Sequence, residues 1–173
     1  MIPYLFVIAA MLFRLLPHPW NMTPIGAMFI FSGATFRSRG QSLLVPLGVL
    51  MLSDYAVDHF IYHGAYAWFS PYTWLGFLAM GLGGWMLRGR LRWSGVLAAS
   101  VGASVAFYLI SNFGVWIGWN IYPATLAGLV QCYTAALPFF RNALVGDIAW
   151  SALMFACYFW LTQRHPALAV ETH

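Results

Sequence analysis

Carboxylate groups occur in segments of this sequence that are otherwise almost entirely apolar. Asp54 and Asp58 are four residues apart and share one face of a helix, and Asp147 lies in a separate apolar segment. An ionised group inside a membrane is costly unless it is paired or meets water. Arg14 and Arg141 are expected at similar depths, and two compatible interpretations follow. These cations either pair with Asp54 and Asp147 and join helices, or line a ligand cavity with them. A proton relay is the weakest alternative, because no longer chain of acids crosses to the other side.

Two histidines have a spacing that is found in metal sites. His59 and His63 stand at i and i+4, which places two imidazoles on one side of a helix. No Glu or Cys ligand stands beside them, so we predict no metal site built by the chain itself. Interfacial histidines, or ligands to a metal carried by a bound molecule, fit the pattern better.

Aromatic residues are dense in the segments that join the apolar stretches. Trp68, Trp116 and Trp119 are examples. Interfacial belts of Trp and Tyr explain much of this density. A pocket for a large, flat or partly apolar ligand would use the same residue types, so both interpretations stay open.

Motifs of nucleotide binding and hydrolysis are absent from the sequence. It contains no P-loop, no G-x-S-x-G and no H-E-x-x-H. We therefore predict a protein that is not an enzyme and has no cofactor. Two alternatives stay open. One is a small intramembrane enzyme that uses Asp54, Asp147 and a histidine on a lipid-soluble substrate. The other is a structural subunit of a larger membrane complex.

The composition of the chain is that of an integral membrane protein. Hydrophobic residues make up 62% of the 173 residues and charged residues only 7%, against roughly 25% in a soluble domain. We predict an all-α protein with six transmembrane helices, a single domain at 1–163 and a polar cytoplasmic tail at 164–173. Thr23 is the expected N-cap of the second helix, and a short extra helix is expected at 125–136, before Pro138. The six helices are predicted at 3–16, 23–36, 42–62, 71–87, 94–117 and 139–163.

The arginines predict the orientation of these helices. With the N-terminus inside, only Arg14 and Arg141 fall on the outer side, and the other arginines fall in cytoplasmic loops or the tail. Both termini are therefore predicted to be cytoplasmic. The net charge of +4 reflects these topology signals and does not indicate a nucleic-acid partner. The predicted cytoplasmic arginines are Arg37, Arg39, Arg88, Arg90, Arg92 and Arg164.

This orientation places nearly all polar residues able to hold a ligand on the outer half of the protein. The cytoplasmic side has arginines and little else, so a ligand site near the outer face is expected. The predicted substrate-binding residues are Arg14, His18, Asn21, Asp54, Asp58, Trp68, Tyr72, Asn112, Trp116, Trp119, Tyr133, Arg141, Asn142 and Asp147.

Several segments together resemble a family of small bacterial putative transport proteins. That family is similar to the S-components of energy-coupling-factor (ECF) transporters, which bind vitamins. The resemblance implies six short helices, a ligand near the outer face, and a multi-pass protein of the bacterial cytoplasmic (inner) membrane. The partners it implies are a vitamin-like small molecule, the lipid bilayer and an ECF transmembrane and ATPase module, unless the protein acts alone. The segments are RLLPHPWNMTPIGAMFIFSGATF, PLGVLMLSDYAVDHF, SNFGVW and YPATLAGLVQCYTAALPFFRNALVGD.

Within that family the chain is most similar to the solitary cobalamin type. The shared features are His18, the L-S-D that ends in Asp54, and an aromatic loop leading to Tyr72. That type ligates cobalt through a loop cysteine, whereas this chain has Ala67 about where the cysteine is expected. Cobalamin is nevertheless the leading substrate hypothesis, with cobalt met by an imidazole, by water or by the vitamin's own base, and a different substrate is the alternative. The A-x-x-x-A docking pattern is also missing from the first helix, which favours a protein that acts alone. The candidate cobalt ligands are His18, His59 and His63.

Overall fold

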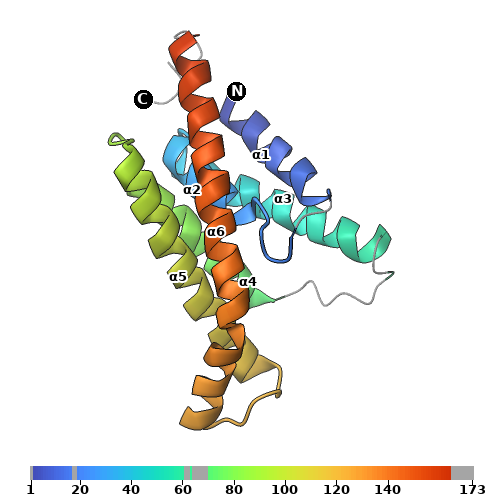
Figure 1. The fold of residues 1–173 in the computed structure, drawn as a ribbon. Coiled ribbons are helices and arrows are strands. Elements are labelled where there is room, and N and C mark those ends of the chain that lie inside the picture. The colour runs from blue at the N-terminus through green and yellow to red at the C-terminus, as the bar shows by residue number, and fades with distance from the viewer. Residues whose placement is uncertain (1, 17–18, 61–62, 64–69, 165–173) are drawn as a thin grey trace.

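The described part of the chain is entirely helical, as predicted. In this computed structural model, residues 2–16, 19–60, 63 and 70–164 are described. Their helices run in the order α1, α2, α3, α4, α5 and α6 (Figure 1). The predicted ends agree to within about three residues, except at the start of the last helix. The bounds are Ile2–Arg14, Ile25–Thr35, Arg39–Phe60, Pro71–Trp85, Trp93–Gly118 and Leu126–Arg164.

Three of these helices are long and apolar enough to cross a membrane. They are α3, α5 and α6, which have 22, 26 and 39 residues. The helices α1, α2 and α4 have 13, 11 and 15 residues. At about 1.5 Å per residue they reach roughly 16–23 Å, less than the ~30 Å of a hydrocarbon core.

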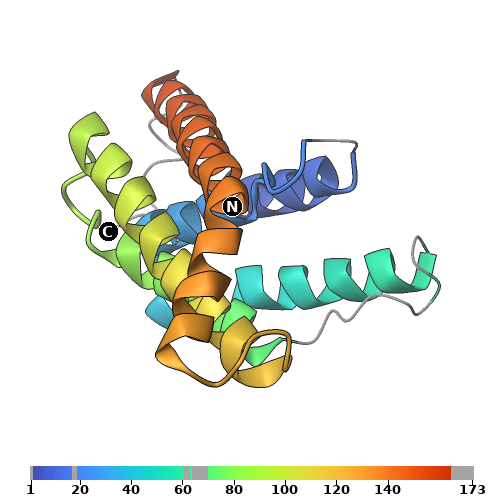
Figure 2. The same ribbon diagram turned by 60° about the horizontal axis from the view of Figure 1, so that its bottom comes forward.

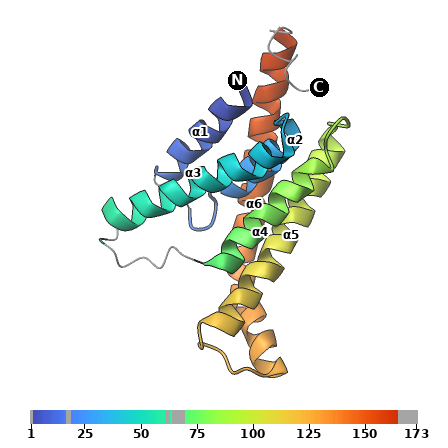
Figure 3. The ribbon, with the colours of Figure 1, turned by 180° about the vertical axis from the view of Figure 1, so that it is seen from behind.

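The short helix α2 is the centre of the fold. Every residue from Ile25 to Thr35 is buried, and α2 contacts α1, α3, α4, α5 and α6. Figures 1 and 3 show it between α6 on one side and α3 and α4 on the other. Its few polar groups are satisfied within the core: the Ser32 hydroxyl bonds to the carbonyl of Ser42 at 2.8 Å, and the Thr35 hydroxyl to that of Phe31 at 2.8 Å. The sequence prediction of Thr23 as N-cap is wrong, because the chain enters this helix at Pro24, which makes no side-chain cap.

The backbones of α2 and α4 touch where both helices have glycine. A Cβ on Gly84 would collide with the carbonyl oxygen of Ile30, and a Cβ on Gly33 would collide with that of Gly81. Such close crossings are typical of helices in membranes, where small residues let backbones approach. The crossing holds α4 against the central helix.

The helices α1 and α3 lie on one side of the molecule, and α4 and α5 on the other. Figure 2 shows α1 and α3 extending away from α4, α5 and α6, and Figures 1 and 3 agree. The two groups meet at α2, which contacts both.

The last helix is continuous through Pro138, which corrects the prediction of a break there. Residues 125–136 were expected to form a separate short helix, but they supply the first turns of α6. Proline removes one backbone hydrogen bond, and membrane helices tolerate it when neighbouring groups compensate. The Tyr133 hydroxyl bonds to the carbonyl of Leu109 at 2.6 Å, and the Trp116 indole to that of Pro123 at 2.9 Å. These bonds hold the hairpin of α5 and α6 together where it extends beyond the other helices (Figure 1).

The predicted cytoplasmic arginines of the loops gather at one end of the fold. The guanidinium of Arg88 donates to the carbonyl of Gly33 at 2.8 Å and lies over the Trp85 ring, as does Arg39. Burial, and to a lesser extent Arg39, lowers the pKa of Arg88. Because the ordinary pKa of a guanidinium lies far above neutral pH, Arg88 stays charged there. We call this part of the fold, with Arg37, Arg39 and Arg88, the arginine end. It joins the end of α2, the start of α3 and the loop after α4.

Candidate functional site

The first polar cluster of interest is an ion pair between α1 and α3. The guanidinium of Arg14, at the end of α1, donates to the carboxylate of Asp54 and to the hydroxyl of Ser53. Only 12% of the Arg14 side chain and 8% of the Asp54 side chain are exposed. The side chain of Trp74, on α4, also interacts with this carboxylate. The interpretation of Arg14 and Asp54 as a pair that joins helices is therefore confirmed.

Three polar residues on α3 and just beyond it are more exposed than Asp54. Asp58 lies one turn further along and is half-buried. His59 is exposed and stacks on Tyr55, with ring centroids 5.8 Å apart. His63 is exposed, with its backbone in the left-handed region at φ 51°. Within the described ranges, no three His, Cys, Asp or Glu side chains come together in a way that could hold a metal ion.

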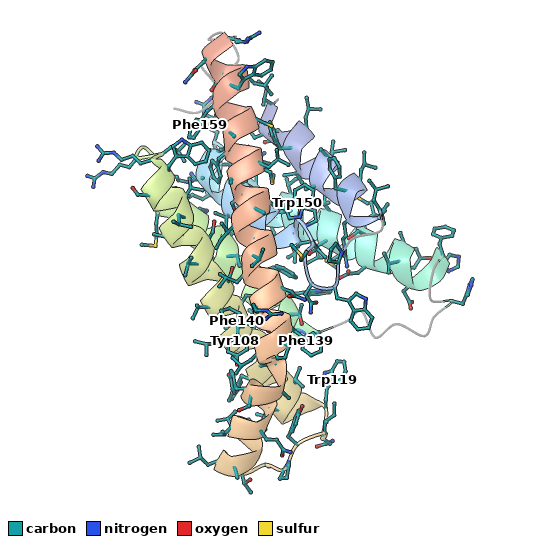
Figure 4. All side chains as sticks on the ribbon, in the orientation of Figure 1. Tyr108, Trp119, Phe139, Phe140, Trp150 and Phe159 are labelled. Carbon is teal, nitrogen blue, oxygen red and sulfur yellow. The ribbon has the colours of Figure 1, made fainter. Side chains whose placement is uncertain are left out.

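The second polar cluster lines a cavity of about 240 Å³ between α5 and α6. Its polar lining comes from two helices and from the segment before α2. Its apolar walls are mainly aromatic. Figure 4 shows Tyr108, Phe139 and Phe140 gathered where α5 and α6 lie side by side. The rings of Tyr108 and Phe140 are 4.6 Å apart. The polar residues are Asn21, Ser104, Ser111, Asn112 and Asp147, and the aromatic ones are Phe107, Tyr108, Phe139 and Phe140.

Asp147 supplies the carboxylate of this cavity. Its Oδ2 accepts a hydrogen bond of 2.6 Å from the Ser104 hydroxyl. Its Oδ1 lies against the first turn of α2, because a Cβ on Gly26 would collide with it. A helix start carries unpaired N–H groups and the positive end of the helix dipole, which favours an anion there. Gly26 thus leaves the space that the carboxylate occupies.

The segment before α2 is fixed on α6 beside this carboxylate. The indole of Trp150 donates to the carbonyl of Met22 at 3.0 Å, and Gly146 leaves room for the Met22 backbone. Asn21, with φ 60°, adopts the left-handed conformation that Asn accepts more readily than most residues. This turn brings Asn21 to the cavity.

Asp147 has no cationic partner among the described residues. Arg14 pairs with Asp54, and Arg141 is exposed and does not line the cavity. The predicted pair of Arg141 and Asp147 is therefore not formed. Six helical positions separate the two residues, which turns their side chains about 120° apart around α6.

The remaining predicted site residues have separate positions. Asn21, Asn112 and Asp147 line the cavity, whereas Asn142 is half-buried outside its lining. His18 and Trp68 lie outside the described residues, as does nearly all of the predicted tail, 165–173. The other aromatic candidates lie near the C-terminal end of α5. The Tyr72 ring contacts Phe113, and the Tyr133 hydroxyl donates to the carbonyl of Leu109. The Trp116 indole donates to the carbonyl of Pro123, and Trp119 is exposed.

Sequence reasoning missed most of the cavity lining. Ser104, Tyr108, Ser111 and Asn112 stand at i, i+4, i+7 and i+8, which is one face of α5. That polar stripe was available in the sequence. On α6, the lining residues Phe139, Phe140, Ala143 and Asp147 all lie within the predicted helix 139–163. The predicted break at Pro138 separated only Ala136 from them.

The fold and the cavity define an all-helical protein with three helices able to cross a membrane and a buried carboxylate beside aromatic walls. The chain belongs to the family described as DUF6580, a family of unknown function, which matches residues 1–168. No curated protein and no solved structure matches this chain.

Proposed function

We propose that this protein is a multi-pass membrane protein that binds a small solute in the cavity between α5 and α6. The observation that carries the proposal is a partly apolar cavity with a buried carboxylate that no arginine neutralises in the part of the chain that the structure describes. A purely structural subunit gains nothing from such a group, because an unpaired buried charge destabilises the fold. Ligand pockets have this composition: mostly apolar walls and a few oriented polar groups.

The surface supports a location in the lipid bilayer. The long helices expose large apolar side chains, such as Leu52 on α3, Leu109 on α5 and Leu153 on α6. Water would disfavour this surface, and lipid would not. We propose that all six helices lie within the bacterial inner membrane, with the shorter ones completing the bundle and both termini cytoplasmic. The arginine end supports that orientation.

The transport role that we propose is that of a substrate-binding component. It rests on the resemblance to ECF S-components and on the position of the cavity away from the arginine end. Transport driven by ATP would need a partner module, because the chain has no P-loop.

The size of the cavity supports a smaller solute than cobalamin. Drug-sized ligands occupy pockets of roughly 300–1,000 Å³. The present cavity, at about 240 Å³, lies just below that range. A corrin ring with its nucleotide loop is several times larger, so we propose a small vitamin-like or metabolite-sized solute instead.

The test is mass spectrometry of small molecules that co-purify with the detergent-solubilised protein. Ala143→Trp fills the cavity, since Ala143 lines it. Ala152→Trp is the matched control, because Ala152 is an exposed position on the same helix. We expect the wild type and Ala152→Trp to carry the same solute and Ala143→Trp to lose it. Equal solute in all three proteins would reject the cavity as the site.

A further inference from the structure

Two buried carboxylates of this protein have opposite surroundings. Asp54 and Asp147 are similarly buried, with 5% and 7% of each residue exposed. Asp54 has the Arg14 guanidinium, whereas the protein groups against Asp147 are the neutral Ser104 hydroxyl and the Gly26 backbone. Within the described ranges, the fold thus supplies a cation to Asp54 and none to Asp147.

Two other polar groups of the cavity, those of Ser111 and Asn112, use a donor within α5 and keep an oxygen acceptor. The Ser111 hydroxyl donates to the carbonyl of Phe107 at 2.7 Å, and the Asn112 amide donates to that of Tyr108 at 2.8 Å. The Tyr108 hydroxyl is also used, because it donates to the carbonyl of Tyr133 at 2.6 Å. Oxygen lone pairs of Ser111 and Asn112 stay available in the same cavity as Asp147. A ligand that fits this lining brings N–H groups of its own.

The walls of the cavity suit a positive charge as well. Phe107, Tyr108, Phe139 and Phe140 line it together with Asp147. Faces of aromatic rings attract ammonium groups, and the attraction grows when water is excluded. Since the Tyr108 hydroxyl is bonded elsewhere, Tyr108 contributes its ring to the wall.

We propose that the solute is a small organic cation, an amine whose ammonium group binds the Asp147 carboxylate while its apolar part lies against the aromatic rings. This inference rests on the proposed function, because it names the substrate class of the same cavity. The ligand would complete for Asp147 the ion pair that Arg14 completes for Asp54.

Two probes of the same shape, one cationic and one neutral, test the inference. Phenethylamine is a cation at neutral pH, and 2-phenylethanol is its neutral counterpart of the same size. Binding to the purified protein in detergent is measured by calorimetry. We expect the wild type and Ala152→Trp to prefer the amine, and Ala143→Trp to bind neither probe.

Asp147→Asn keeps the size of the side chain and removes its charge. We expect it to weaken amine binding about 10–100-fold, the range for a hydrogen bond to a charged group. Binding of the alcohol should change little. Phe140→Leu is a second variant that removes a ring without touching the carboxylate, and it should weaken the amine more than the alcohol. Size-exclusion chromatography establishes that each variant is folded.

The outcomes separate this inference from the proposed function. Equal binding of amine and alcohol, or amine binding unchanged in Asp147→Asn, overturns the organic cation. A neutral or anionic co-purified solute that Ala143→Trp loses also overturns it, while the solute-binding function stands. If the wild type carries no solute and binds neither probe, both proposals fail.

Discussion

Substitution of Asp54 by alanine is expected to destabilise the protein strongly, because it leaves the Arg14 guanidinium buried without its anion. The pair is nearly excluded from solvent and joins α1 to α3. Removal of one partner of a buried ion pair typically costs about 3–5 kcal/mol of folding free energy. Ser53 stays as a neutral acceptor for Arg14, so we expect a loss near the lower limit, about 3 kcal/mol.

Arg37→Ala is the matched control for this substitution. Arg37 also carries a charge, but it lies exposed in the loop between α2 and α3. Exposed substitutions usually change stability by less than about 0.5 kcal/mol. Equilibrium unfolding in mixed detergent micelles measures both variants against the wild type.

A double substitution distinguishes the cost of an unpaired buried charge from the cost of lost side-chain contacts. In Arg14→Leu with Asp54→Leu no charge is left unpaired, so the double variant should be more stable than Asp54→Ala. Buried ion pairs replaced by apolar residues are often as stable as the original. Equal stability of Asp54→Ala and Arg37→Ala would refute the reasoning, as would a double variant less stable than the single one.

Three further predictions concern topology, helix packing and the α5–α6 hairpin. In a cysteine-free background, a cysteine in place of Arg39 should react only with reagents that enter the cell. A cysteine in place of Asn120 should react with impermeant reagents as well. Labelling of position 39 by an impermeant reagent would contradict the predicted topology. Gly84→Ala should destabilise the protein by about 1–3 kcal/mol through overpacking. Gly102→Ala should be neutral or stabilising, because a Cβ there meets open space. Thermal unfolding of the two variants side by side decides this. Tyr133→Phe removes the hydrogen bond to the α5 backbone and should cost about 0.5–1.5 kcal/mol, with faster hydrogen exchange in the first turns of α6; unchanged exchange there would contradict this role.

The sequence by itself determined the helical class and most helix positions of this protein. These properties depend on local features: long apolar runs and helix-ending Gly, Pro and Arg residues. It also predicted that Arg37, Arg39 and Arg88 lie on the same side of the protein, and these three residues do meet at one end of the fold. Among the candidate site residues, the sequence identified those that are charged, such as Asp54 and Asp147, because charged residues are rare in this chain.

Only the tertiary structure decided which of these charges are paired. Sequence spacing cannot show that Arg14 reaches Asp54 while Asp147 meets Ser104 and Gly26, because each contact joins helices far apart in the chain. The continuity of α6 through Pro138 was likewise decided in the tertiary structure, where α6 contacts α5 both before and after this residue that locally ends helices. The cavity exists because this packing brings Phe139 and Phe140 against the polar face of α5.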